Sequence, residues 1–309
     1  ADFDADGRLD LLLIGMPSPT VDRLEHLGTV RPGSTQDPRR RTAMTRGNRL
    51  YLARADGGFH DGGELGQSIA RSGWSWGCAA ADFDNDGFPD VAIGNGMESK
   101  ATVRDYESEY WLHDQHVGTS EEDPVTYLYY KSKIARTRGS GWSYGGYEKN
   151  RLYLNRSGRR FFEAGHLLGV ALEQDTRNVL SEDMDADGKP DLVVVSFEKW
   201  PEPKPTLRIF GNGLADTGRW IGFRLPGARP GTRVTIRHGG RVQTRQIVAG
   251  DSYRSQHSEV VHFGLGTSEG VDEAVLEGPG NKKRALAGLA SNRYYRIAEG
   301  GFGPISGTE

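Results

Sequence analysis

The chain has a single cysteine, Cys78, so it cannot close a disulfide within itself. It has no apolar run of the roughly 20 residues that a membrane-spanning helix needs. The short signatures of common catalytic sites are missing too: there is no Gly-x-Ser-x-Gly, His-Glu-x-x-His, P-loop or Cys-x-x-Cys-His. These absences weigh against a disulfide-stapled scaffold, a helical membrane protein and the commonest hydrolase and nucleotide-binding classes.

The charge balance excludes a further class. The chain carries 39 basic and 42 acidic residues, a formal net charge of −3, so it lacks the basic excess of a nucleic-acid-binding domain. The basic run Arg39–Arg41 is interpreted as a solvated loop rather than a nucleic-acid patch. With 43 glycines and 36% hydrophobic residues among 309, the composition predicts two turn-rich soluble domains with ample core.

Aspartate, by contrast, is abundant and follows a repeated pattern. One nine-residue loop occurs at 2–10, 82–90 and 183–191, with Asp at positions 1, 3, 5 and 9 and Gly at position 6. The loops offer as side-chain metal ligands Asp2, Asp4, Asp6, Asp10, Asp82, Asp84, Asp86, Asp90, Asp183, Asp185, Asp187 and Asp191. Position 7 can add a backbone carbonyl ligand from Arg8, Phe88 and Lys189.

Carboxylates this close repel one another and raise each other's pKa unless a cation lies between them. Ca²⁺ takes about six to eight oxygen ligands, whereas Mg²⁺ rarely uses a cage made by protein alone. Gly7, Gly87 and Gly188 allow the sharp turn that wraps such a loop around an ion. We therefore predict up to three Ca²⁺ ions, one per loop, rather than three acidic surface turns.

The first six loop positions also match an EF-hand, but the remainder does not. An EF-hand requires a bidentate Glu at position 12, where this chain has Leu13, Ile93 and Val194. A short aliphatic run follows each loop, such as Leu192–Val195, and predicts a buried strand rather than an exiting helix. Each loop is therefore expected to join two strands.

The residues around the loops repeat as well. Asn48-Arg-Leu-Tyr-Leu52 and Gly58-Phe59 follow the first loop, and Asn150-Arg-Leu-Tyr-Leu154 and Phe161-Phe162 follow the second. The unit is strand, Asp loop, strand, insert, strand, aromatic turn and strand, and four strands per unit indicate a propeller blade. The loops start at residues 2, 82 and 183, a spacing well beyond the roughly 40–50 residues of a bare blade.

The extra length predicts two inserts, at about Pro17–Arg46 and about 98–148. The second insert is expected to fold, because disordered segments are poor in aromatic residues. Its aromatic residues are Tyr106, Tyr110, Trp111, Tyr127, Tyr129, Tyr130, Trp142, Tyr144 and Tyr147. They either form a contact surface for a partner or pack the insert against the propeller.

The last third of the chain has a different pattern. Between about 216 and 300, strands of period 2 are separated by Pro and Gly turns and predict a small β-sandwich domain. The clearest of these strands are Arg219–Leu225, Thr232–Arg237, Arg241–Val248 and Glu259–Phe263. Residues 301–309 are expected to form a flexible tail. The predicted fold class is thus all-β, with incomplete propeller blades over 1–213 followed by the sandwich.

The Asp loops, the Asn-Arg-Leu-Tyr-Leu strands and the Gly-Phe turns resemble the FG-GAP, or VCBS, repeat of integrin-type β-propellers. The stretches Gly231–Ile236, Gly250–Gln256 and Val261–Gly266 resemble the ASPIC/UnbV domain. This domain order resembles the cartilage acidic protein family and its bacterial relatives. The resemblance implies Ca²⁺ in the loops between blade strands and a secreted protein, in a family mostly without assigned chemistry.

We therefore predict a calcium-binding propeller that acts as an interaction, adhesion or accessory-subunit scaffold and not as a catalyst. An extracellular, periplasmic or cell-surface location is expected, because extracellular calcium modules bind weakly and need ambient calcium of about millimolar concentration. The expected partner is a protein or a multi-subunit complex, with a glycan as a further candidate, and neither nucleic acid nor a membrane span is expected.

Two expectations accompany this prediction. About two and a half blades are fewer than the roughly 4–8 of a closed propeller, so upstream blades are expected in a missing N-terminal portion or on another chain. The alternative function is a copper or zinc enzyme with its site in the second insert. His113 and His116 have the i, i+3 spacing of two metal ligands on a helix, although no third ligand is evident.

Overall fold

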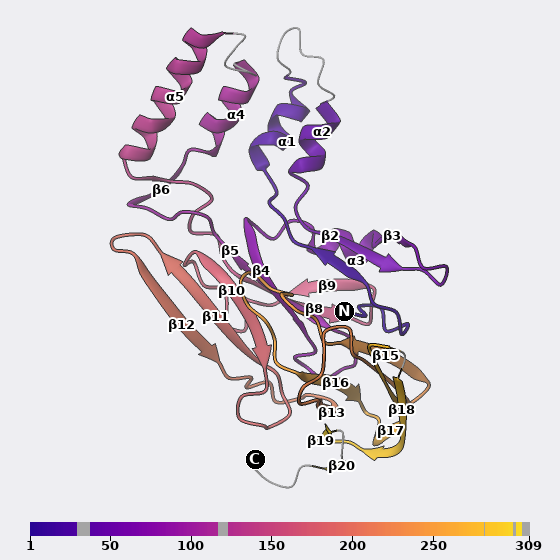
Figure 1. Ribbon diagram of the computed structural model, residues 1–309. Helices are drawn as coiled ribbons and strands as arrows, with labels where there is room; N and C mark the ends of the chain where they lie inside the picture. Colours follow the sequence, from indigo (N-terminus) through magenta and orange to yellow (C-terminus); the bar gives the residue numbers. More distant parts are fainter. Residues whose placement is uncertain (30–37, 117–122, 281, 299–300, 305–309) are drawn as a thin grey trace.

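Three small antiparallel sheets, each associated with one Asp loop, form the first two thirds of the molecule (Figure 1). The computed structural model describes residues 1–29, 38–116, 123–280, 282–298 and 301–304. The strands of the first sheet are, in spatial order, β1 (Leu11–Leu13), β2 (Arg49–Ala53) and β3 (Phe59–Asp61). Those of the second sheet are β4 (Ser75–Ala81), β5 (Asp90–Asn95), β8 (Arg151–Arg156) and β9 (Arg160–Glu163). Those of the third sheet are β10 (Thr176–Glu182), β11 (Asp191–Glu198) and β12 (Lys204–Phe210). We call these sheets blades 1, 2 and 3.

The second and third loops lie between strands, as predicted, and the first loop precedes β1. In blades 2 and 3 the residue before the loop pairs with its ninth residue, Ala81 with Asp90 and Glu182 with Asp191. Nine residues are thus closed into a compact turn at one end of the blade. Strand predominance and these sheets confirm the predicted all-β, propeller-like class.

Neighbouring blades pack face to face through apolar side chains. One buried cluster joins blades 1 and 2 and includes Phe3, Leu50, Ile93 and Phe161. A second joins blades 2 and 3 through Phe83, Ala92, Val179, Leu192 and Val194. Blade 2 is therefore buried on both faces, which is why every residue of β5 is buried.

The two inserts are largely helical, which the sequence analysis did not predict. The first contains α1 (Pro19–His26) and α2 (Pro38–Met44); the second contains β6 (Thr102–Asp105), α4 (Glu107–His116), α5 (Pro124–Gly139) and β7 (Trp142–Ser143). Ser18 and Asp123 cap α1 and α5, each followed by the proline that favours the first helical position. The inserts sit side by side at the end of the blades opposite the C-terminal domain (Figure 1). A further helix, α3 (Gly63–Ile69), places Leu65 and Ile69 in the apolar cluster between blades 1 and 2.

Two four-stranded sheets form the C-terminal domain around a single apolar core. The strands of one sheet are, in spatial order, β16 (Val260–Gly266), β13 (Arg219–Arg224), β19 (Arg293–Ala298) and β20 (Gly301–Pro304). Those of the other sheet are β15 (Arg241–Gln246), β14 (Arg233–His238), β17 (Gly270–Gly278) and β18 (Lys282–Ala290). Phe223, Phe263 and Ile236 are fully buried between the sheets. This is a β-sandwich of the predicted kind.

The prediction of a flexible tail over residues 301–309 is wrong for residues 301–304. These residues form β20 and pair with β19, so that Ile297 lies opposite Phe302. The backbone groups of both strands thereby gain hydrogen-bond partners. Residues 305–309 lie outside the described part of the chain. Among the described residues, no helix is both long and apolar enough to cross a membrane.

Candidate metal centres

The first aspartate of each loop organises the backbone of the turn. Oδ1 of Asp2, Asp82 and Asp183 accepts the N–H of loop position 5 at 3.0, 3.0 and 3.1 Å. Oδ2 accepts the N–H of the glycine at position 6 at 3.0, 2.8 and 2.8 Å. The position-5 aspartate accepts the N–H of position 7, at 2.8–2.9 Å in the three loops. The three loops therefore have one conformation.

Two residues of each loop have a left-handed backbone. Gly7, Gly87 and Gly188 have φ of +87°, +99° and +88°, which confirms the sharp turn expected at position 6. Position 4 also has positive φ, at Ala5, Asn85 and Ala186. The sequence pattern did not single out position 4, because alanine gives no signal for such a conformation.

The turn brings three carboxylates of each loop together. Oxygens of Asp2, Asp4 and Asp6 lie within 4.8 Å of one another, as do those of Asp82, Asp84 and Asp86. In the third loop the group consists of Asp183, Asp185 and Asp191, without Asp187. Two oxygens bound to one Ca²⁺ at about 2.3–2.6 Å cannot be much farther apart than this, so each cluster is small enough to share a single ion.

The ninth aspartate has a structural task that the sequence did not reveal. One oxygen of Asp10, Asp90 and Asp191 accepts the N–H of loop position 2 at 2.7–2.9 Å. The other oxygen accepts the N–H of a residue near the end of β2, β8 or β12: Ala53, Asn155 or Asn212, at 2.7–2.9 Å. Both oxygens thus tie the loop to its own blade.

Two of those end residues also connect neighbouring blades. Asn155 Nδ2 donates to the carbonyl of Pro89 in its own loop at 3.0 Å and to the carbonyl of Phe3 in the preceding loop at 2.8 Å. Asn212 Nδ2 makes the equivalent bonds to Pro190 at 3.0 Å and Phe83 at 2.8 Å. These asparagines are missed functional residues, and their shared place after the Leu-Tyr-Leu and Arg-Ile-Phe strands was the available signal.

The carboxylates of the second loop would be stabilised most by a bound cation. Burial, and then the charges of Asp86 and Asp84, raise the pKa of Asp82 well above its usual range. Burial and Asp84 raise the pKa of Asp86 to about 6. In the other loops a basic side chain at position 7 pairs with the position-5 carboxylate, Arg8 with Asp6 and Lys189 with Asp187. The second loop has Phe88 at that position.

The C-terminal domain contacts all three loops. Thr244 N–H donates to Asp2 Oδ2 in the first loop at 3.1 Å. Tyr294 O–H donates to Asp183 Oδ2 in the third at 2.6 Å. Asn85 of the second loop is fully buried: its Oδ1 accepts from His262 at 2.7 Å and its Nδ2 donates to Gly188 O of the third loop at 2.9 Å. These contacts place the loops at the joint between blades and sandwich.

The residues present fit Ca²⁺. All candidate ligands are hard oxygen atoms, and Asp4 Oδ1 is buried without a hydrogen-bond partner among the described residues. Burial raises the pKa of Asp2 to about 6, and burial together with neighbouring carboxylates raises the pKa of Asp82 and Asp86. A cation in each cluster would favour the charged forms of these groups.

The second insert divides its aromatic residues between core and surface. Tyr106 and Trp111 are buried, and the Tyr106 ring stacks on Tyr144 with centroids 4.7 Å apart. Tyr110 and Tyr129 are exposed. Packing thus accounts for the buried pair, whereas a contact surface formed by the exposed pair stays a prediction. The side chains of His113 and His116 lie outside the described part of the structure.

Three blade-like sheets with acidic turns and a β-sandwich define a β-propeller-like protein with candidate metal loops. Comparison with known families agrees: a family model for an FG-GAP-like repeat matches residues 2–93, and one for ASPIC and UnbV matches residues 227–302. The chain therefore combines an FG-GAP-like repeat with an ASPIC/UnbV domain. Both indicate an extracellular type of protein, and neither is a typical catalytic family.

No curated protein matches the chain. Among solved structures, one is described as a Ca²⁺-stabilized adhesin that helps an Antarctic bacterium reach out and bind ice. It aligns with 80% of this chain at 9% identity and a TM-score of 0.15, and the alignment spans 56% of that protein's length. A TM-score this low says nothing about the fold or function of this chain.

Proposed function

We propose that the protein is a calcium-stabilised interaction scaffold whose three loops join blades and C-terminal domain into one rigid body. The observation that carries this proposal is the position of the loops. Contacts from Thr244, His262 and Tyr294 of the C-terminal domain reach the first, second and third loop in turn. A Ca²⁺ ion in a loop would neutralise carboxylates beside the joint and hold the backbone that the domain contacts.

Metal binding would also change the charge of the whole molecule. Three Ca²⁺ ions would carry the formal net charge from −3 to about +3, which reverses the long-range attraction to charged partners. Loops of this kind bind calcium weakly, at about 10⁻⁴–10⁻³ M in extracellular modules. An extracellular, periplasmic or cell-surface location follows, since calcium is available there.

Exposed apolar side chains support a protein partner. Val125, Leu128 and Tyr129 lie on one face of α5 at helical spacing, and all three are exposed. Tyr110 of α4 is exposed as well. The helical inserts would thus present a contact surface, while the blades hold them in place.

The outer face of blade 3 supports a second contact, with a partner that is itself a blade. Phe3 and Phe83, at loop position 2, insert into the following blade and are 1% and 4% exposed, whereas Met184 at the same position is 56% exposed. Leu207 and Ile209 of β12 are exposed as well. A further FG-GAP-like blade, from another part of a longer protein or another chain, would cover these residues.

Calorimetry with protein stripped of metal tests the calcium assignment. Titration with CaCl₂ should show up to three sites, and Asp84→Ala should remove one of them. Asp56→Ala, an exposed aspartate in the β2–β3 turn, is the matched control and should leave the number of sites unchanged. Absence of binding heat in the unaltered protein, or an unchanged number of sites in Asp84→Ala, would contradict the proposal.

Metal analysis of the protein purified without chelators separates the scaffold from the alternative enzyme. Calcium alone supports the scaffold. Stoichiometric copper or zinc would instead support a metalloenzyme with a site around His113 and His116.

A further inference from the structure

The three Asp loops share one backbone conformation, but they differ in how many of their carboxylate oxygens other donors already engage. A bound Ca²⁺ ion needs about six to eight oxygen ligands. A carboxylate oxygen that also accepts from a cationic side chain or a second donor is less available to an ion. Equivalent positions of the three loops can therefore be compared, and positions 5 and 1 both set the second loop apart.

The first difference is at loop position 5. In every loop, Oδ1 of this aspartate accepts the N–H of position 7. In the first and third loops, the side chain at position 7 also pairs with Oδ2: Arg8 with Asp6, and Lys189 with Asp187 at 3.0 Å. Asp187 does not belong to the carboxylate cluster of its loop. Asp86 of the second loop is followed two residues later by phenylalanine, and it forms no ion pair among the described residues.

The same difference recurs at position 1. In the first and third loops, Oδ2 of this aspartate accepts a second donor from the C-terminal domain: Thr244 N–H at 3.1 Å and Tyr294 O–H at 2.6 Å. Asp82 Oδ2 accepts the glycine N–H of its own loop at 2.8 Å, and no donor from the described part of the C-terminal domain reaches it. That domain places Gly264 there, where a side chain would overlap Asp82 Oδ2.

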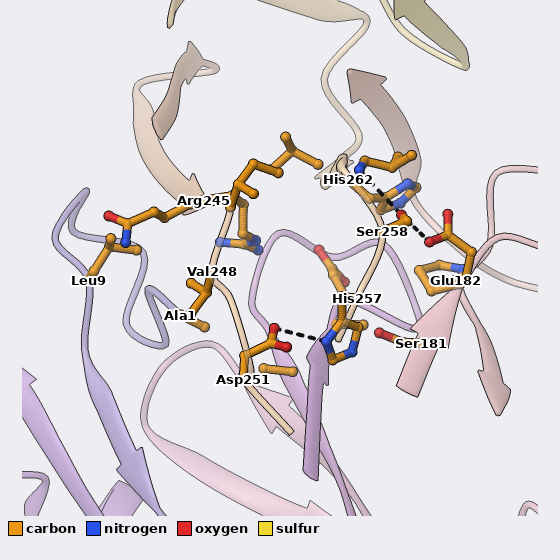
Figure 2. Close-up of a pocket in the computed structure, with 18 of the residues that line it drawn as sticks. Ala1, Leu9, Ser181, Glu182, Arg245, Val248, Asp251, His257, Ser258 and His262 are labelled. Carbon is orange, nitrogen blue, oxygen red and sulfur yellow. Dashed lines mark hydrogen bonds and ion pairs between the residues drawn. The ribbon is translucent and has the colours of Figure 1, made fainter. Parts of the chain in front are cut away.

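Two arginines of β15 approach the second loop, and neither removes this difference. Arg245 lies at the joint between the blades and the C-terminal domain (Figure 2). Its charge lowers the pKa of Asp2 as well as that of Asp82, so it does not distinguish the first loop from the second. Arg241 donates to the backbone carbonyl of Asp86 at 3.1 Å and not to its carboxylate. The carboxylate oxygens of the second loop therefore remain the most available to an ion.

We propose that the second loop is the tight calcium site of this protein, and that Arg8 and Lys189 hold the first and third loops at weaker affinity. An exposed ion pair is worth little by itself, so the main cost is repulsion between Ca²⁺ and the cationic side chain that stays close to it. The inference rests on the calcium assignment proposed above and adds an order of filling to it. As the calcium concentration rises, the second loop fills first.

Calorimetric titration with CaCl₂ tests this order in metal-stripped variants that keep one loop intact. The aspartate at position 3 is the one to replace, because it belongs to each cluster whereas those at positions 1 and 9 also hold the backbone. Asp4→Ala with Asp185→Ala leaves the second loop, Asp84→Ala with Asp185→Ala leaves the first, and Asp4→Ala with Asp84→Ala leaves the third. The dissociation constant of the second loop should be about tenfold lower than that of either other loop.

Removing the competing cation should strengthen binding in the weak loops. Lys189→Met in the protein that keeps the third loop, and Arg8→Met in the one that keeps the first, should lower the dissociation constant about 3- to 10-fold. Misfolding cannot produce a gain of affinity. Lys131→Met, at an exposed lysine of α5, removes the same charge far from the loops and should change nothing. Because salt screens charges, the gain should shrink in about 1 M KCl.

The possible results separate this inference from the calcium assignment. Equal dissociation constants for the three single-loop proteins would overturn the order of filling and leave the calcium assignment intact. The same holds if Lys189→Met and Arg8→Met bind calcium no more tightly, or if their gain does not depend on salt, since the side chains would then not act through charge. No binding heat in any of the proteins would overturn the calcium assignment and this inference with it.

Discussion

Tyr294 O–H donates a 2.6 Å hydrogen bond to Asp183 Oδ2, which joins the C-terminal domain to the first aspartate of the third loop. The Tyr294 ring also packs on Trp220, with centroids 4.7 Å apart, and Trp220 lies against Gly188 of the same loop. A side chain at Gly188 would overlap that indole. The loop and the domain are therefore fitted to each other by both a hydrogen bond and close packing.

Removing this hydroxyl group measures the strength of the joint. Tyr294→Phe keeps the ring and deletes only the bond to a charged acceptor, so the free energy of unfolding should fall by about 1–2 kcal/mol. Urea denaturation in calcium-containing buffer measures the change. The control, Tyr129→Phe on the exposed face of α5, should be neutral, and an unchanged midpoint for Tyr294→Phe would refute the role of this contact.

The hydrogen bond between neighbouring blades can be tested by substituting Asn155. Asn155→Ala leaves the carbonyls of Phe3 and Pro89 without their buried donor, and should lower the free energy of unfolding by about 1–3 kcal/mol. The equivalent residue of blade 1 is Ala53, so alanine is compatible with the backbone here. Asn178→Ala on β10, which removes a bond to the C-terminal domain instead, is the comparison. A loss smaller than that of Asn178→Ala would argue against a special role for the blade connection.

His238 should make stability depend on pH. Burial, and then the charge of Arg241, lower the pKa of His238 in the folded protein, and its Nε2 accepts a hydrogen bond from Gln243 Nε2, a nitrogen that could not accept one from a protonated ring. The unfolded chain therefore binds more protons than the folded one below about pH 6.5. The contribution of this residue is present above that pH and lost as the pH falls through the folded pKa.

Urea unfolding at about pH 7.5 and about pH 5.5 brackets this range. The stability of His238→Gln at the lower pH, relative to its stability at the higher pH, should exceed that of the unaltered protein, because the titrating group is gone. His60→Gln, at an exposed histidine, should keep the full dependence. Identical pH dependence in all three proteins would exclude His238 as the source.

Cys78 should be unreactive in the folded protein. Burial raises the pKa of its thiol to about 11, and the thiolate is the reactive form. At about pH 8, alkylation by iodoacetamide should be on the order of 100-fold slower than in urea-unfolded protein. Mass spectrometry follows the reaction, and equal rates in the two states would show that the thiol is accessible and unperturbed.

The loops, the strands after them and the β-sandwich were predictable because their signals are local. Carboxylates at alternate positions, a glycine at position 6 and a following aliphatic run lie within a dozen residues of one another. The metal assignment itself stays a prediction: the structure brings together three carboxylates in each loop, but places Asp187 outside the third group and uses Asp10 and Asp90 to hold the backbone.

The joint between the domains could not be read from the sequence. Thr244 and Asp2 are 242 positions apart, and neither residue type indicates in the sequence that the two are in contact. The helices of the inserts were missed for a different reason. Only a capping residue and a proline mark α1 and α5, and α5 has no buried residue among those described to create an apolar periodicity.

Thermal unfolding with and without calcium tests the central claim most directly. If three ions hold the loops, EDTA should lower the melting temperature measured in about 10 mM CaCl₂ by about 10 °C, because each site at about 10 times its dissociation constant adds about 1.4 kcal/mol of stability. Added CaCl₂ should restore the original value. A melting temperature that EDTA leaves unchanged would contradict the account of this protein as a calcium-stabilised scaffold.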